Sequence, residues 1–172
     1  MIINLHEDDN PVITTERLTL RLLEDNDAAD ILEIRGDQDT ADDAGVPCMK
    51  SIEEAQAYIR QWYEDSMAIV LGNEVIGLIE SYKGDNLKYN STFLGYYMKK
   101  RHRNQGYMTE ALVALTDRMI EDGKKSPMLW IFSDNMASKR VAEKCGWELV
   151  DCRLVDNGGR NRFVEFFDNN PD

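Results

Sequence analysis

The stretch from residue 99 to residue 108 has the composition of a phosphate-binding loop. Four basic residues lie within five positions at its start: Lys99, Lys100, Arg101 and Arg103. Gly106 follows them and directly precedes an expected helix, so consecutive backbone N–H groups at the helix start could bind an anion, and the glycine would let a phosphate approach the backbone closely. A pyrophosphate site is therefore one interpretation. An ordinary solvated basic loop before a helix is the other.

A second segment, which begins at Asn135, also combines polar side chains with a helix start. Asn135 could cap a helix that extends to Cys145, and this structural role alone would account for the residue. Ser138 lies three residues further along the chain. Its hydroxyl could belong to an ordinary helix start or could face a ligand, and the residue itself leaves both interpretations open.

Together, the two segments resemble the GNAT (Gcn5-related) N-acetyltransferases. The pyrophosphate motif of that family, Arg/Gln-x-x-Gly-x-Gly/Ala, is matched at Arg103 and Gly106, and residues 107–111 follow a common continuation of it. The segments 14–21 and 95–98 are most similar to the RimJ/RimL-like branch, which includes the ribosomal-protein N-terminal acetyltransferases. The second family motif, Asn-x-x-Ser followed by Glu-Lys-x-Gly-aromatic, is matched by six residues: Asn135, Ser138, Glu143, Lys144, Gly146 and Trp147.

The resemblance implies an acetyl-CoA-dependent N-acetyltransferase, an acyltransferase that moves the acetyl group directly from its co-substrate acetyl-CoA to a primary amine. It implies a V-shaped cleft between two splayed parallel strands, 91–98 and 128–132. The pantetheine arm would pair with the first strand, and the pyrophosphate would lie on the amides of residues 103–108. The implied cofactor-binding residues are Tyr97, Met98, Arg103, Asn104, Gln105, Gly106, Tyr107, Met108, Thr109, Asn135 and Ser138.

The two candidate catalytic residues rest on different grounds. Many family members place a tyrosine, the general acid for the leaving thiolate, directly before Glu-Lys-x-Gly, but this chain has Ala142 there. The resemblance then assigns the acid role to Ser138. A general base must produce a neutral amine for attack, and Glu80 is the candidate because it interrupts the apolar run 75–79 near the expected cleft. The alternative for Glu80 is an ordinary solvent-facing strand residue. Cys145 is expected to pack in the core and not to act as a nucleophile.

The sequence does not decide which amine is the acceptor or whether the protein is catalytic. A protein N-terminal α-amine of the ribosomal-protein type is one candidate acceptor. A small amine, such as a polyamine, an antibiotic or an amino acid, is the other, since one fold serves many substrates. The alanine at position 142 also keeps a second class of protein under consideration, a non-catalytic acyl-CoA-binding module that regulates or senses. An unrelated α/β domain with two chance motif matches is a third class, and it predicts no CoA binding.

Hydrophobic periodicity predicts the elements that position these residues. About seven strands are expected at 18–22, 67–71, 74–81, 91–98, 128–132, 148–155 and 161–167, and about four helices at 27–35, 52–62, 108–119 and 136–145. This order predicts a mixed α/β (α+β) fold, a GNAT-like central sheet flanked by helices, with residues 1–172 as one domain. The acidic stretch 37–43 is expected to be an exposed loop over the acceptor side. Trp62 and Trp130 fit core positions, and either Tyr96 or Tyr97 should face the cleft.

Composition narrows the classes of function. The net charge of −12 argues against a nucleic-acid partner. It suits a cationic acceptor, although acidic charge also simply favours solubility. No apolar run approaches the about 20 residues of a membrane span, and the three cysteines and two histidines lack metal-ligand spacing, so we expect neither a membrane nor a metal. Reduced cysteines and the lack of a visible signal peptide favour a cytoplasmic protein, and the similar branch is compatible with a homodimer.

Overall fold

Eight strands form one sheet in the computed structural model, which describes residues 12–83 and 91–169. Within this part of the chain, the sheet order is β1-β2-β3-β4-β5-β6-β8-β7, and all neighbours are antiparallel except β5 and β6. The strands are β1 (Ile13–Thr14), β2 (Thr19–Leu22), β3 (Ser66–Leu71), β4 (Glu74–Lys83), β5 (Thr92–Met98), β6 (Met128–Phe132), β7 (Glu148–Asn157) and β8 (Arg160–Asp168).

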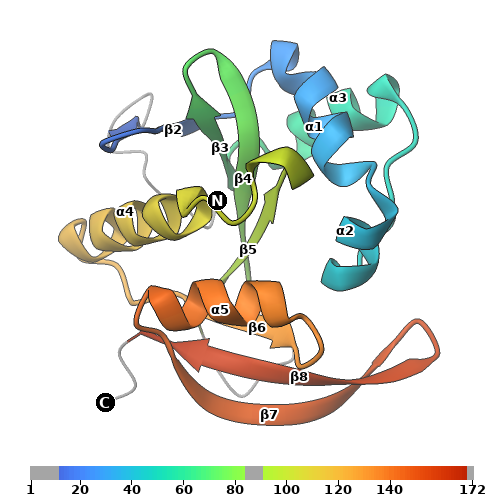
Figure 1. Cartoon of the computed structure of the whole chain (residues 1–172), viewed down its shortest axis with the longest axis vertical. Coiled ribbons are helices and arrows are strands. Elements are labelled where there is room, and N and C mark those ends of the chain that lie inside the picture. The colour runs from blue at the N-terminus through green and yellow to red at the C-terminus, as the bar shows by residue number, and fades with distance from the viewer. Residues whose placement is uncertain (1–11, 84–90, 170–172) are drawn as a thin grey trace.

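The α-helices of the described residues cover both faces of this sheet (Figure 1). α1 and α3 pack on one face, and α4 and α5 pack on the other. The mixed α/β class is confirmed, with one short strand (β1) and one helix (α2) more than the sequence predicts. No described helix combines the length and apolar composition that crossing a membrane requires. The helices are α1 (Ala28–Arg35), α2 (Gln38–Ala44), α3 (Ile52–Trp62), α4 (Tyr107–Glu121) and α5 (Met136–Lys144).

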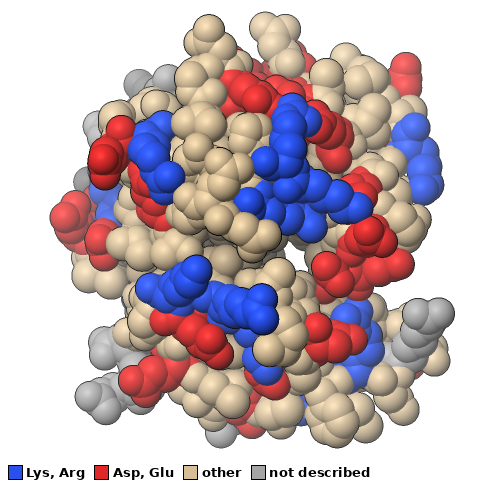
Figure 2. All heavy atoms as spheres, viewed as in Figure 1, with Lys and Arg blue, Asp and Glu red and all other residues tan. Residues whose placement is uncertain are grey.

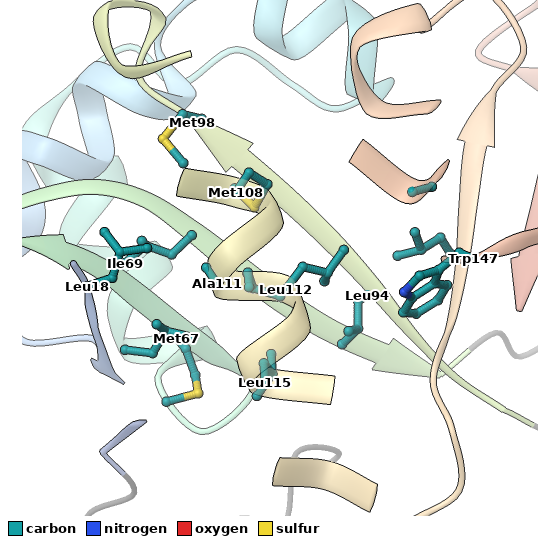
Figure 3. Packing of buried hydrophobic residues seen from close by; sticks show 14 of the residues in the cluster. Leu18, Met67, Ile69, Leu94, Met98, Met108, Ala111, Leu112, Leu115 and Trp147 are labelled. Atoms are coloured by element: carbon teal, nitrogen blue, oxygen red, sulfur yellow. The ribbon is translucent and has the colours of Figure 1, made fainter. Parts of the chain in front are cut away.

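The apolar stripe that the sequence predicts for α4 holds this helix on the sheet. Met108, Leu112 and Leu115 recur at three- and four-residue spacing, and all three are buried. Figure 3 shows them between α4 and the sheet, next to Ile69 and Leu94. Burial of each such side chain stabilises the folded state by about 1.5–3 kcal/mol. The stripe therefore holds the first turn of α4 in one position relative to the strands.

The two parallel strands separate almost as soon as they meet. β5 and β6 pair at one position only, Phe93 with Met128, and β6 then pairs along its length with β8. The predicted splay is therefore confirmed. Beyond Phe93, the backbone groups on this edge of β5 have no strand partner among the described residues, so they are available to a ligand that lies between the strands.

The acidic stretch 37–43 is not the exposed loop that the sequence predicts. It forms most of α2, in which Asp37 accepts a hydrogen bond from the Thr40 N–H (2.9 Å) as the N-cap and Gly45, at φ 67°, ends the helix. Thr40 and Ala41 are buried. Sequence periodicity missed the helix because aspartate is a poor helix former and only two residues of the segment face the interior.

The buried face of α3 also differs from the predicted one. Ala55 and Ile59 are buried as predicted, but Ile52 in the first turn is 38% exposed, whereas Tyr58 is buried. The Tyr58 hydroxyl donates a hydrogen bond to Glu80 of β4. An apolar pattern cannot indicate this contact, because it joins two polar groups that are 22 residues apart in the sequence.

Candidate active site

A cavity of about 690 Å³ lies where β5 and β6 separate, with walls from β4, β5, β6, every α-helix named above and the loop before α4. Figure 2 shows the hollow between α5 and the half of the molecule that carries the start of α4. Every residue that the sequence assigns to cofactor binding lines this cavity except Gln105, and so do both candidate catalytic residues, Glu80 and Ser138. The fold thus gathers side chains that are more than 50 positions apart in the sequence.

The loop before α4 has the backbone geometry of an anion site. A short 3-10 turn, Lys100–His102, leads into it. Asn104 and Gly106 then adopt positive φ values of 60° and 82°, and Gly106 is the residue from which α4 starts. Because the first N–H groups of a helix have no partner within the helix, those of α4 are free to bind an anion in the cavity.

An ion pair from the start of the described chain holds this loop in place. Arg17 pairs with Glu110 in the first turn of α4 (2.7 Å), donates to the backbone oxygen of Gln105 (3.1 Å) and lies 4.5 Å above the ring of Tyr107. Thr15 donates a second hydrogen bond to Glu110 (2.5 Å). The partly buried Glu110 would have a raised pKa, but the hydrogen bonds from Thr15 and Arg17 outweigh burial and lower that pKa. No local pattern in the sequence indicates this support, because Arg17 and Glu110 are 93 residues apart.

Replacing Gly106 with Ala is expected to raise the Kd for acetyl-CoA about tenfold, because a Cβ here strains the left-handed backbone by roughly 1–2 kcal/mol. It would also lie 3.4 Å from the Arg17 guanidinium, against the ion pair that holds the loop. Gly123→Ala is the matched control: Gly123 has φ 70° just beyond the other end of α4, and its Cβ would meet no atom within 4 Å. Calorimetric titration should show weaker binding for Gly106→Ala alone. Equal Kd values for the two variants would contradict the anion-site assignment.

Most of the positive charge before Gly106 is matched by carboxylates and does not face the cavity. The ammonium of Lys99 is fully buried among Asp30 (2.5 Å), Glu33 (3.0 Å) and Glu74 (2.8 Å), which are close enough together to hold a metal ion but surround this lysine instead. Two further basic residues are also paired, Lys100 with Asp37 and Asp39, and Arg101 with Glu33 and Glu74. These residues fasten the loop to α1, α2 and β4.

Arg103 is the member of the basic group that lines the cavity, and it connects the loop to α2. Its Nε donates to the backbone oxygen of Met98 (3.0 Å) and its Nη2 donates to Thr40 (2.7 Å). From the other wall, Asn135 donates to the backbone oxygen of Asp43 (3.2 Å) and caps α5 as predicted, by accepting from the Ser138 N–H (3.0 Å). α2 is therefore tied to both walls.

Removal of the α2 cap should lower stability. We expect Asp37→Ala to cost about 1 kcal/mol, the usual value of an N-cap, and Asp39→Ala, which loses only an exposed partner of Lys100, to cost less than half of that. Thermal unfolding at neutral pH measures both. An equal loss in the two variants would contradict the capping role.

The same cap should also depend on pH. Burial by itself would raise the pKa of Asp37, but hydrogen bonds from Lys100 and Thr40 hold it at about 2, below the ordinary 3.8. Because the folded-state pKa is the lower one, the stabilisation is complete above pH 3.8 and is lost as the pH falls toward 2. The stability difference between wild type and Asp37→Ala should shrink in that window.

Glu80 is buried, which excludes the alternative of a solvent-facing strand residue. It is 7% exposed, and its Oε1 accepts hydrogen bonds from Arg35 (2.6 Å) and from the Tyr58 hydroxyl. Its Oε2 accepts from the Tyr97 hydroxyl (3.3 Å). Burial raises the pKa of both tyrosines, and the charge of Glu80 adds to it, so both hydroxyls remain protonated donors. With two acceptor positions on each oxygen, Oε2 retains one for a further partner.

Gly95 leaves room beside that oxygen. It lies directly opposite Glu80 in the β4–β5 ladder. A Cβ at Gly95 would be 3.8 Å from Oε2 of Glu80 and 3.5 Å from the ring of Tyr82. The glycine therefore opens a space on the face of the sheet that α1 and α3 cover, next to the unused acceptor position.

Ser138 lies at the opposite wall, in the first turn of α5. Its side chain is half-buried and lines the cavity, and its backbone oxygen accepts a hydrogen bond from the Tyr96 hydroxyl (2.8 Å). Burial raises the pKa of Tyr96, so this phenol is protonated. Tyr96 and Tyr97 both line the cavity, whereas the alternation along β5 predicts that only one of them does.

The predicted core position is correct for Cys145 but not for the two tryptophans. Cys145 packs against the core as expected, and burial raises the pKa of its thiol to about 11, which keeps it protonated. Trp62 and Trp130 are only half-buried and line the cavity, although their patterns fit core positions. The sequence analysis did not identify Arg35 as a residue of the site, because a basic residue in the last turn of a helix usually interacts with the helix end.

Comparison with known proteins agrees with this fold. Residues 17–148 match the family model described as acetyltransferase (GNAT) domain. The uncharacterized N-acetyltransferase YoaA of Bacillus subtilis (strain 168) is 26% identical over 148 residues, which are 80% of this chain and 83% of that protein. A GNAT-family acetyltransferase from Bacillus anthracis superimposes with a TM-score of 0.81 at 20% identity, covering 92% of this chain and 97% of its own. RimL, a ribosomal L7/L12 alpha-N-protein acetyltransferase in complex with coenzyme A, superimposes with a TM-score of 0.78 at 17% identity, covering 92% and 97%.

The splayed sheet with a glycine-started helix at its opening is the architecture of an acyl-group transferase. The family match covers most of the chain, and the chain belongs to the acetyltransferase (GNAT) family. It is an enzyme of the acetyltransferase class.

Proposed function

We propose that this chain is an acetyl-CoA-dependent N-acetyltransferase that acts on a primary amine. The observation that supports this most is the cavity itself, which has unpaired helix-start amides at one end and a buried carboxylate with a free acceptor position on the other side of β5. Acetyl-CoA, when bound, supplies an acetyl group activated as a thioester. The residues present suit such a molecule, since the edge of β5 beyond Phe93 offers backbone partners to its amide-containing arm.

The residues divide the binding work by position. Of the amides of residues 103–108, that of Arg103 donates to the backbone oxygen of Lys100 (3.3 Å), so those of residues 104–108 would hold the pyrophosphate. Tyr97 and Met98 would pair through their backbone with the pantetheine arm. Met108 and Asn104 differ from the smaller residues common in the family motif, but binding through the backbone N–H does not depend on the side chain. Asn135, Ser138 and Thr109 would complete the walls around the arm.

The proton transfers would involve Glu80 and Ser138. An acceptor amine beside Gly95 would lose a proton to Oε2 of Glu80, directly or through one water molecule, as its nitrogen forms the bond to the acetyl carbon. As the carbon–sulfur bond breaks, the hydroxyl of Ser138 would give a proton to the leaving sulfur and regain one from water, while Glu80 would release its proton to water. Backbone N–H groups of β5 near the reacting carbonyl would stabilise the negative charge on its oxygen.

The acceptor would be a protein N-terminal α-amine, as in the RimL relative, or a small amine. The test is CoA release from acetyl-CoA with a panel of short peptides with varied N-termini, polyamines, aminoglycosides and free amino acids, with blanks for the three protein thiols. Turnover on one class supports the proposal and identifies the acceptor. A protein that neither releases CoA nor binds acetyl-CoA would contradict it.

A non-catalytic acyl-CoA sensor is the second candidate. Ala142, where many relatives have a tyrosine, and the three protein partners of Glu80 favour it. It predicts that acetyl-CoA raises the melting temperature while no amine in the panel is acetylated. Turnover on any amine at a rate above the blank would exclude it.

We also propose a homodimer and a cytoplasmic location. Leu154 of β7 and Phe163 of β8 form a cross-strand pair, and both are more than half exposed. A second copy of the chain could cover such an apolar pair, which lies at the β7 edge of the sheet. The three unpaired cysteines support the location. Light scattering after size exclusion should give twice the mass of 19.8 kDa, and Leu154→Asp should return it to one.

A further inference from the structure

The cavity wall on the face of the sheet that α1 and α3 cover carries several aromatic rings. α3 contributes Trp62, β4 contributes Tyr82 and β6 contributes Trp130, and all three line the cavity while they remain only half-buried. Val46 and Phe132 extend the same apolar wall. A large ring that is half exposed on a cavity wall lacks part of the stabilisation that burial gives, and a pocket lined by several such rings is typical of a site that buries an apolar part of a ligand.

These rings begin directly beside the position proposed for the acceptor amine. A Cβ at Gly95 would lie 3.8 Å from Oε2 of Glu80 and 3.5 Å from the ring of Tyr82, so this ring borders the space beside the carboxylate. On the helix side, the Tyr58 hydroxyl donates to Glu80, and the Tyr58 ring stacks on Trp62 with the centroids 6.3 Å apart. A group attached to the amine would therefore meet aromatic carbon on the sheet side and on the α3 side.

Buried side chains hold the rings of the sheet in place. Tyr82 stacks on Phe93 (6.0 Å between centroids), and Phe93 contacts the buried Phe166 edge-on (6.2 Å). Trp130 packs edge-on against the buried Phe132 (5.2 Å). A wall that is already ordered needs little further ordering when a ligand binds, so contacts with it can contribute fully to selectivity.

The charges around these rings do not favour a second cation in the acceptor. The Arg35 guanidinium lies 4.4 Å from the ring centroid of Tyr97, and that of Arg162 lies 3.5 Å from the ring centroid of Phe132. Protein cations thus already occupy two of the aromatic faces and would repel another cation close to them. Asp43 of α2 also lines the cavity, but it is exposed, so solvent and salt screen its charge.

We infer that the acceptor is a primary amine that carries an aromatic group on a short carbon link, an inference that rests on the proposed function. With the amine beside Oε2 of Glu80, the aromatic group would lie against Tyr82, Trp62 and Trp130. A small arylalkylamine and a polypeptide with an aromatic N-terminal residue share this chemistry. Polyamines and aminoglycosides lack such a group and would leave the rings without a partner.

The test compares 2-phenylethylamine with ethanolamine, two amines of similar basicity that share an aminoethyl group and differ in a phenyl or a hydroxyl group. We expect kcat/KM to be about a hundredfold higher for 2-phenylethylamine, because burial of a whole ring adds more binding than the roughly tenfold or more of a single methylene. Two tripeptides that differ only in an N-terminal Phe or Gly test the polypeptide source. 1,4-Diaminobutane tests a second cation.

Variants of the two tryptophans connect the preference to these rings. Trp62→Leu and Trp130→Leu should each lower the preference for 2-phenylethylamine over ethanolamine about tenfold. Because the preference is a ratio of two rates from one preparation, a partly unfolded variant still gives a valid value. Tyr63→Leu is the matched control, since Tyr63 follows Trp62 in the chain but is 44% exposed and lies outside this cavity. Its preference should equal that of the wild type.

The outcomes separate this inference from the proposed function. Equal kcat/KM values within both the amine pair and the peptide pair, or a higher value for 1,4-diaminobutane, would overturn the inference and leave the N-acetyltransferase activity intact. A preference that survives in both tryptophan variants would also overturn it, since another part of the chain would then bind the aromatic group. A preference in the peptide pair alone supports the inference and identifies a polypeptide acceptor. If no amine is acetylated, the proposed function itself fails.

Discussion

Glu80→Gln is expected to lower kcat/KM for the amine acceptor by about a thousandfold, within the range that a general base contributes. The amide retains the shape of the side chain, but its one oxygen can replace only one of the two carboxylate oxygens to which Tyr58 and Tyr97 donate. It cannot take up a proton from the attacking amine. Steady-state rates of CoA release measure the loss. The Kd for acetyl-CoA should stay within about twofold of wild type, because Glu80 lies on β4 opposite Gly95, where the acceptor and not the acetyl-CoA is proposed to bind.

The same substitution leaves the Arg35 charge buried without its partner. Both side chains of the pair are 10% exposed, and removing one member of a buried pair typically costs about 3–5 kcal/mol. Rates must therefore be compared at a temperature at which circular dichroism shows that the variant is folded. A folded Glu80→Gln protein with activity within about threefold of wild type would contradict the assignment of Glu80 as the base.

Gly95→Ala provides a matched control that leaves the ion pair intact. The new Cβ would make only ordinary van der Waals contacts, so stability should not fall. It would fill the space beside Oε2 of Glu80 where the acceptor amine is proposed to lie. We expect a rise of about tenfold in the KM for the amine, with an unchanged Kd for acetyl-CoA. An unchanged KM would place the acceptor elsewhere in the cavity.

Ser138→Ala is expected to lower kcat by about a hundredfold, the lower end of the range for general acid catalysis. Stability should be preserved, because the cap of α5 uses the backbone N–H of Ser138 and alanine is a good helix former. Substrate binding should change little, since the hydroxyl acts when the carbon–sulfur bond breaks. Single-turnover measurements with saturating acetyl-CoA separate this step from binding.

Tyr96→Phe is the control for Ser138. It removes the phenol that donates to the Ser138 backbone oxygen and leaves the serine hydroxyl in place. We expect a loss of less than about fivefold, consistent with a positioning contact. If instead Tyr96→Phe loses more activity than Ser138→Ala, the phenol and not the serine donates the proton, and the assignment of the acid must move to β5.

Short-range patterns were enough to predict the frame of the molecule. The apolar stripe of α4 and the cap of α5 depend on neighbours within a few positions, and both are present as predicted. The positions of the phosphate loop and of Asn135 and Ser138 followed from local motifs for the same reason. Family resemblance then supplied the splay of β5 and β6, which no local pattern contains.

Only the tertiary structure decided which charges serve the site. Lys99, Lys100 and Arg101 look like phosphate ligands in the sequence, but carboxylates from α1, α2 and β4 neutralise them. Arg35 and Glu80 are 45 residues apart and look unrelated, yet they form a buried pair. Ion pairs and polar contacts join residues at any sequence separation. Such contacts, from Lys100, Arg103 and Asn135, also stabilise α2. The sequence by itself therefore determined most of the elements, because these depend on local patterns, and the folded chain determined the chemistry of the cavity between them.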